Sequence, residues 1–169
     1  MSLYSVARRT ALGVFAALAL AACATAPAGP AAPSATDSLT LERGVCFGFC
    51  PDYIVTIRGD GSVSYEGRRF TRVEGAQTAQ ADPVQTAALF ARAEEMGFFD
   101  LQDAYRAHVT DIPQFRVTYT RGGRTKTIVD YGGRMMGMPE SVTQLEEEID
   151  RVAGTDRWVK RDGQPAPSK

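Results

Sequence analysis

The sequence has no apolar run of 18 residues, which excludes a protein with several membrane-spanning helices. It also has no excess of basic charge, because 19 lysines and arginines face 20 acidic residues. We therefore expect no nucleic-acid partner. Cysteine and histidine are scarce, with three and one residues. What is present, 169 residues of which 44% are hydrophobic, is enough for one packed domain and short accessory segments.

The N-terminal segment has the pattern of an export signal. Arg8 and Arg9 precede an uncharged run over residues 10–22, which is 13 residues long. A run of this length is too short to cross a bilayer as a helix but suits the apolar part of a signal peptide. The arginine pair leaves twin-arginine export open as an alternative to general secretion. We predict that residues 1–22 are removed as a signal peptide.

The end of this run resembles the bacterial lipobox. Leu20, Ala21 and Ala22 stand directly before Cys23, the cysteine that in lipoproteins receives diacylglycerol before cleavage. The resemblance implies that Cys23 carries fatty-acyl chains such as palmitate, which bind the lipid bilayer stably when two or more are present. Ala24 follows instead of an aspartate that would retain the protein at the inner membrane. The predicted location is the periplasmic face of the outer membrane.

Composition divides the remaining chain into three parts. Residues 24–38 are rich in alanine and proline, with prolines at positions 27, 30 and 33, so residues 23–38 are interpreted as a lipidated cysteine followed by an extended tether. The 15 residues after Cys23 would span up to about 45 Å. Residues 160–169 are predicted to be a disordered tail. The single folded domain is placed at residues 39–159.

Strand patterns dominate the first half of this domain. Leu39, Leu41 and Val45 indicate an edge strand, and residues 70–73 are expected to add another strand after the first hairpin. That hairpin joins residues 53–57 to residues 62–65 through Gly59-Asp60-Gly61. A three-residue loop with Gly61 in the left-handed conformation pairs Ile57 with Val63 and Val55 with Tyr65, which gives one apolar face.

Helical patterns alternate with a second hairpin in the other half. Asp82 and Pro83 predict the start of a helix that ends before Gly97. Its apolar side is expected to be Val84, Ala88, Leu89, Ala93 and Met96. A second hairpin flanks Gly122-Gly123. Pro139 opens a last helix, in which Val142, Leu145, Ile149 and Val152 face the core, Glu146, Glu147 and Glu148 face solvent, and Gly154 ends the helix. These patterns predict an α+β domain with an antiparallel sheet of about five strands packed by two helices.

Cys46 and Cys50 are the two cysteines that remain after lipidation of Cys23. An even pair in an oxidising compartment favours a disulfide, and Gly48 allows so small a ring to turn. The alternative is a metal site, because a Cys-x3-Cys-Pro motif resembles the copper-delivery proteins of the synthesis-of-cytochrome-oxidase family. Cys46, Cys50 and His108 would then hold copper, since thiolates favour Cu(I). A strand rather than a helix follows the motif, which favours the disulfide and no cofactor.

Two longer stretches resemble a known family. Residues 41–53, including Cys46-Phe47-Gly48-Phe49-Cys50-Pro51, and residues 59–67 are similar to the bacterial family called domain of unknown function 6438. Similar short motifs recur at residues 109–111, 126, 129–131 and 149–150. The resemblance implies a shared fold and often an envelope location, but it brings no activity and no catalytic residues.

These observations favour a lipoprotein of the cell envelope that is a non-enzymatic binding or structural module, with an envelope protein as its partner. No serine or acid pair has a spacing that identifies a nucleophile or a general acid. The alternative function is a copper- or thiol-handling periplasmic protein that uses Cys46, Cys50 and His108.

Overall fold

The computed structural model describes residues 31–161 and 164–165. The predicted signal peptide, Cys23 and the first part of the predicted tether lie outside the described residues. Among the described residues, no helix is both long and apolar enough to cross a membrane.

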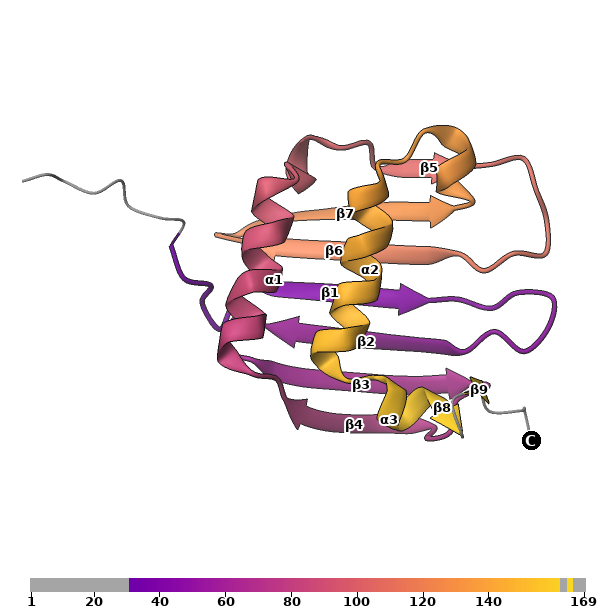
Figure 1. The fold of residues 1–169 in the computed structure, drawn as a ribbon, viewed down its shortest axis with the longest axis horizontal. Coiled ribbons are helices and arrows are strands. Elements are labelled where there is room, and N and C mark those ends of the chain that lie inside the picture. The colour runs from indigo at the N-terminus through magenta and orange to yellow at the C-terminus, as the bar shows by residue number, and fades with distance from the viewer. Residues whose placement is uncertain (1–30, 162–163, 166–169) are drawn as a thin grey trace, which may run out of the picture.

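One seven-stranded sheet forms the body of the domain, with the strand order β4-β3-β2-β1-β6-β7-β5 (Figure 1). Neighbouring strands are antiparallel, except that β5 pairs in parallel with β7. The strands are β1 (Ser38–Arg43), β2 (Asp52–Arg58), β3 (Ser62–Arg69), β4 (Gly75–Gln80), β5 (Ala104–Arg106), β6 (Phe115–Arg121) and β7 (Arg124–Tyr131). A separate ladder joins β8 (Lys160–Arg161) to β9 (Gln164–Pro165), within the tail predicted to be disordered.

The helices are α1 (Pro83–Glu95), α2 (Glu140–Ala153) and the short α3 (Asp156–Val159). Two 3-10 turns, Phe98–Asp100 and Gly133–Met136, complete the secondary structure. Helices α1 and α2 cross the same face of the sheet side by side (Figure 1). The α+β class is therefore confirmed. The predicted numbers of about five strands and two helices are too low, because the sheet has seven strands and the described residues form three α-helices.

Two strand predictions were wrong in their placement. The strand that contains Leu39 and Leu41 is not an edge strand but the centre of the sheet, because β1 pairs with β2 on one side and β6 on the other. The strand predicted at residues 70–73 is also absent from its predicted place. Instead β3 continues to Arg69, Phe70 turns the chain with a φ of 57°, and the next strand is β4. Strand patterning records which face is apolar but not which strands are neighbours.

The register of the first hairpin was predicted correctly. Ile57 lies opposite Val63 and Val55 lies opposite Tyr65. Gly61 has a φ of 81°, a left-handed conformation that costs glycine little because it has no Cβ. The second hairpin pairs Arg121 with Arg124 across Gly122-Gly123.

Helix α1 begins and ends where its capping residues predict. The Asp82 carboxylate accepts hydrogen bonds from the backbone amides of residues 84 and 85, and Gly97 follows the helix in the left-handed conformation. The predicted apolar face needs correction, because Val84 is 77% exposed and Ala88 is also exposed. The buried residues of α1 are Thr86, Leu89, Phe90 and Ala93. They keep helical spacing, but the buried face includes the large side chain of Phe90 and not that of Ala88.

Helix α2 buries the four apolar residues predicted for it and ends at Gly154. One prediction for this helix was wrong: Glu146 does not face solvent but is only 2% exposed. Position 146 follows Val142 by four residues and precedes Ile149 by three, so it lies on the buried side of the helix. One of its carboxyl oxygens, Oε1, has no hydrogen-bond partner.

The core lies between the helices and the sheet. Its sheet side comes from alternate residues of the strands, such as Leu39 and Leu41 of β1, and the rest comes from α1, α2 and the residues after each helix. The opposite face of the sheet carries hydroxyl side chains, and Thr40 bonds with Thr56 at 2.8 Å between their oxygens. The sheet is thus apolar toward the helices and polar on the other side, as expected for a sheet covered on one face.

The chain enters the domain through a clamp at Asp37. The Asp37 carboxylate, which is only 4% exposed, accepts hydrogen bonds from the Ser34 and Gly122 amides at 2.7 and 2.9 Å and from Arg121 at 2.8 Å. Although burial opposes ionisation, these hydrogen bonds lower the pKa of Asp37 to about 2. The clamp fixes the start of β1 against the turn between β6 and β7.

Candidate functional site

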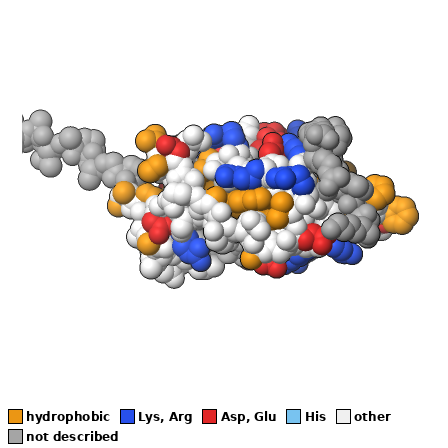
Figure 2. Space-filling view, turned by 90° about the horizontal axis from the view of Figure 1, so that it is seen from below, with side chains coloured by type: hydrophobic (Ala, Val, Ile, Leu, Met, Phe, Trp, Pro, Cys, Tyr) orange, Lys and Arg blue, Asp and Glu red, His pale blue; other side chains and the backbone are white. Residues whose placement is uncertain are grey.

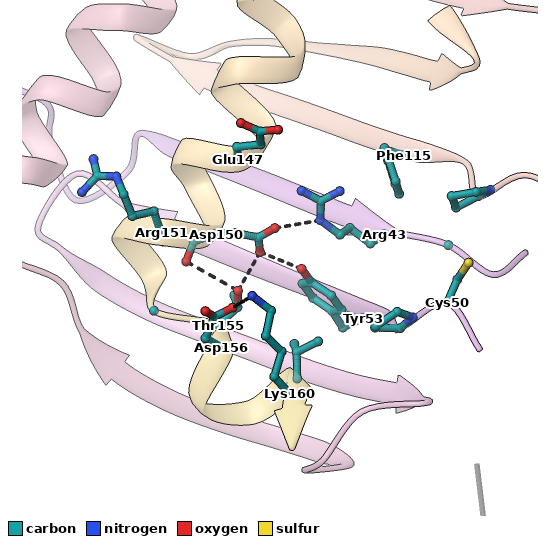
Figure 3. A pocket seen from close by; sticks show the side chains of 15 residues that line it. Arg43, Cys50, Tyr53, Phe115, Glu147, Asp150, Arg151, Thr155, Asp156 and Lys160 are labelled. Atoms are coloured by element: carbon teal, nitrogen blue, oxygen red, sulfur yellow. Dashed lines mark hydrogen bonds and ion pairs between the residues drawn. The ribbon is translucent and has the colours of Figure 1, made fainter. Parts of the chain in front are cut away.

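A pocket of about 590 Å³ opens beside the C-terminal half of α2. It is bounded by α2, α3, the ends of β1 and β2 that meet the disulfide loop, and the segment before β6 (Figure 3). Its lining includes the apolar residues Cys50, Pro51, Pro113, Phe115 and Val159 and the polar residues Arg43, Tyr53, Glu147, Asp150, Arg151, Thr155, Asp156 and Lys160. We call this cavity the α2 pocket.

Strand alternation explains how two polar side chains reach this pocket. Arg43 follows Leu39 and Leu41 at the two-residue period of β1, so it lies on the face that the helices cover. Tyr53 shares the same face of β2 with Val55 and Ile57. Both strands thus present a polar group toward α2 at the end where the apolar pattern stops.

Asp150 of α2 holds these groups together. Its carboxylate accepts hydrogen bonds from Arg43 Nε at 2.7 Å, from the Tyr53 hydroxyl at 2.7 Å and from Thr155 Oγ1 at 2.8 Å (Figure 3). The Arg43 and Asp150 side chains are only 20% and 17% exposed. Charge-assisted hydrogen bonds of this kind are stronger than those between neutral groups, so this cluster fixes α2 to the centre of the sheet.

The electrostatics of the cluster keep Tyr53 protonated and Arg43 positively charged at neutral pH. Burial and the negative charge of Asp150 raise the pKa of Tyr53, so its hydroxyl keeps its proton. Burial lowers the pKa of Arg43, but the Asp150 carboxylate more than compensates and raises it. The cluster therefore contains neither a phenolate nor a neutral guanidine that could start a reaction as a base.

The walls around the cluster are apolar and its rim is charged. The Arg43 guanidinium lies over the Phe115 ring, 4.5 Å from the ring centroid, so Phe115 covers one face of this cation while Asp150 accepts a hydrogen bond from its Nε. At the rim, Lys160 pairs with Asp156 at 2.8 Å and Arg151 pairs with Glu148 at 3.1 Å. An amphipathic molecule fits such a pocket, with its apolar part against the walls and its polar part at the rim.

The predicted disulfide forms part of the pocket wall. Cys46 and Cys50 are joined, with their Cα atoms 5.6 Å apart, and Cys50 lines the pocket together with Pro51. The disulfide is therefore confirmed as a geometric feature, and it sets the direction in which the chain enters β2.

Reduction of this disulfide is expected to lower the free energy of unfolding by about 2 kcal/mol, since a five-residue ring restrains the unfolded chain only slightly. Urea denaturation of the C46S/C50S protein and of the parent protein, with and without reductant, measures the difference. The double variant serves as its own control, because reductant must leave its midpoint unchanged. Loss of folding on reduction would contradict this modest role.

The predicted copper ligands do not form a metal-binding group in the described part of the chain. His108 is exposed on the segment between β5 and β6, and both cysteines are bonded to each other. Within residues 31–161 and 164–165, no three histidine, cysteine or acidic side chains lie close enough to hold a metal ion. Cys23, the predicted lipid-attachment residue, lies outside the described residues.

Arg43, Tyr53 and Asp150 are site residues that the sequence patterns did not predict. Two signals were available: Arg43 continues the apolar alternation of Leu39 and Leu41 in β1, and Asp150 lies four residues after Glu146, a position that helical spacing from Val142 places on the buried side of α2. Their meeting was not predictable, because Arg43 and Asp150 are separated by 107 positions in the chain. Only the placement of β1 at the centre of the sheet, under α2, brings them together.

The fold and the site together define a class of protein: a two-layer α+β domain with helices on one face of a mostly antiparallel sheet and a disulfide-bounded pocket at one end. The chain belongs to the family described as domain of unknown function (DUF6438), whose model matches residues 37–153. The matched region covers the whole sheet and both long helices, which agrees with the resemblance noted in the sequence. No curated protein matches the chain.

Proposed function

We propose that the mature protein is a lipid-anchored binding module of the cell envelope and that the α2 pocket holds the apolar part of an envelope component. The main support for this proposal is the hydrogen bonding of the Asp150 carboxylate. Its carboxylate accepts three hydrogen bonds at 2.7 to 2.8 Å, from Arg43, Tyr53 and Thr155. A carboxylate so occupied serves to hold the pocket in shape rather than to accept a proton from a substrate.

The remaining groups of the pocket support binding over catalysis. Two cations at the rim form ion pairs, Lys160 with Asp156 and Arg151 with Glu148. Pro51, Pro113 and Phe115 supply rigid apolar surface. A pre-formed pocket that combines rigid apolar walls with polar groups in fixed positions is typical of ligand sites. Binding there requires little reorganisation of the protein, which favours affinity.

The proposed location in the cell envelope is inferred from the N-terminal sequence. Export with cleavage before Cys23 and acylation of that residue would place the protein in the outer membrane, facing the periplasm. Labelled palmitate supplied to producing cells tests this step. We expect label in the wild-type protein and none in the Cys23→Ala variant, and equal labelling of both would overturn the anchor.

Site-specific photocrosslinking in cells tests the pocket. A photoreactive residue at position 147, on the exposed rim of the α2 pocket, is expected to give a discrete adduct that excess purified domain reduces. The same residue at position 118, on the polar face of the sheet, is the matched control and should give none. Equal adducts from both positions, or turnover of a small molecule by the purified protein, would contradict a passive binding module.

A thiol-handling role is the second candidate, because Cys50 is part of the pocket wall. A bound thiol there would attack the disulfide and form a mixed disulfide with one cysteine while releasing the other as a thiolate. Titration of free thiols and Cu(I) binding after reduction test this role. Resistance of the disulfide to thiol reagents, together with no Cu(I) binding by the reduced protein, would dismiss it.

A further inference from the structure

The disulfide loop, residues 46–50, exposes two large aromatic side chains. Phe47 is 88% exposed and Phe49 is 65% exposed, and the preceding Val45 is 39% exposed. Figure 2 shows hydrophobic side chains protruding at the right-hand end of the molecule, where the β1–β2 connection lies in Figure 1. Phenylalanines so exposed at a convex tip contribute nothing to the core, so they indicate a contact outside the domain.

The loop is held firmly from three sides. The disulfide closes it, the Phe47 amide donates a hydrogen bond to the Asp111 carbonyl at 3.3 Å, and the Gly44 amide donates one to the Gln114 carbonyl at 2.8 Å. The disulfide closes the loop on itself, and the two hydrogen bonds join the loop and the preceding Gly44 to the segment between β5 and β6. The two phenylalanines are thus presented in a fixed arrangement, which reduces the entropy lost when they bind something.

Phe70 supports the loop from the end of β3 at a cost in backbone energy. Its φ of 57° is in the left-handed region, which bulky side chains rarely adopt. In this conformation its ring packs edge-on against Phe49, with 5.6 Å between the ring centroids. Backbone strain that persists at a position of this kind often marks a functional surface. The conformation of Phe70 thus adds a third ring to the exposed aromatic group of Phe47 and Phe49.

Arginines flank this tip. Arg68 and Arg69 precede Phe70, with side chains 40% and 61% exposed, and Arg72 follows it and is also exposed. Asp52, which pairs with the first two, is only 10% exposed. Arg68 also pairs with Glu42, whose side chain is 23% exposed, at 2.8 Å. Arg69 and Arg72, on either side of Phe70 in the chain, therefore supply the solvent-facing positive charge behind the phenylalanines, an order that matches acyl chains below anionic headgroups.

We propose that this tip, Phe47, Phe49 and Phe70 with Arg68, Arg69 and Arg72, inserts into the surface of an anionic lipid bilayer. Lipid acyl chains can rearrange around a convex group of aromatic rings, whereas a protein partner would need a cavity that matches it. The inference relies on the proposed anchor for its location only. Residues 24–30, which precede the described part of the chain, would span up to about 22 Å if extended. This is close to the length of β1, whose six residues span about 20 Å, so the domain can lie along the membrane that holds Cys23.

Sedimentation with vesicles tests the tip without the anchor. The protein is the mature chain, residues 23–169, with Cys23→Ser so that no acyl chain contributes. We expect it to bind vesicles of phosphatidylethanolamine with phosphatidylglycerol, and F47S and F49S each to weaken binding about tenfold. R69Q/R72Q should weaken binding to these vesicles and reduce its salt dependence, with little effect on vesicles of phosphatidylcholine alone.

The matched control is V84S, which removes an apolar side chain that is 77% exposed at the start of α1 and should leave vesicle binding unchanged. Unchanged circular dichroism and urea midpoints show that the loop variants remain folded. Failure of the parent chain to bind either vesicle, or equal binding by F47S/F49S, overturns the proposal and would assign the tip to a protein partner. Palmitate labelling of Cys23 is a separate measurement, so failure of the anchor and failure of the tip are distinguishable.

Discussion

Replacement of Asp150 by alanine is expected to lower the free energy of unfolding by about 3 kcal/mol. Removal of one partner from a largely buried ion pair leaves the other charge without compensation, and such losses are large. In D150A the Arg43 guanidinium, 20% exposed, and the Tyr53 hydroxyl lose the carboxylate that accepts their hydrogen bonds. Urea denaturation at pH 7, followed by circular dichroism, measures the effect.

The matched control for D150A is D156A, a neighbour in the same part of the chain. Asp156 pairs with Lys160, but its side chain is 72% exposed, and exposed ion pairs contribute about 0.5 kcal/mol. D150N, which keeps the shape and part of the hydrogen bonding, should lie between the two. Equal and small effects of D150A and D156A would show that the Asp150 cluster does not fix α2 to the sheet.

Glu146→Gln is expected to stabilise the protein at pH 8 by up to about 4 kcal/mol while changing little at pH 4. Burial, and then the negative charge of Asp130, raises the pKa of Glu146 from 4.5 in the unfolded chain to about 8 in the folded protein. Between these two values the folded state keeps a proton that the unfolded state has lost. The free energy of unfolding of the wild-type protein therefore falls as the pH rises from about 4.5 to about 8.

The glutamine variant removes this titration, because its side chain is neutral at every pH. Urea denaturation of both proteins at several pH values between 4 and 9 should give curves that meet at low pH and separate above pH 5. E140Q, in the first turn of the same helix at an exposed ion pair with Arg134, is the control and should parallel the wild type. Parallel curves for E146Q and the wild type would contradict a proton held by Glu146.

Local chemistry accounts for the parts of the fold that the sequence predicts well. The hairpin register follows from the length of the Gly59-Asp60-Gly61 loop and the alternation beside it, and the ends of α1 follow from Asp82 and Gly97. Each of these features depends on residues within a few positions of one another. The disulfide of Cys46 and Cys50 belongs to the same group, since four positions separate the two cysteines.

The features that were predicted wrongly depend on distant contacts. β1 became central because it pairs with β6, more than 70 positions along the chain, and nothing in its own alternation of apolar and polar residues indicates a second neighbour. Glu146 was placed in solvent because carboxylates usually are, although helical spacing put it beside Val142 and Ile149. The α2 pocket was not predicted because its residues are far apart in the chain and come together only when the sheet has formed.

If Cys23 anchors the protein to the membrane as we propose, the central position of β1 has a mechanical consequence. Tension from the membrane would enter through the Asp37 clamp and run along β1 when the opposite end of the domain is held. Antiparallel hydrogen bonds are perpendicular to the strands, and β1 has them with both β2 and β6. Two ladders would therefore be sheared at once, whereas an edge strand pulled sideways would peel away one bond at a time.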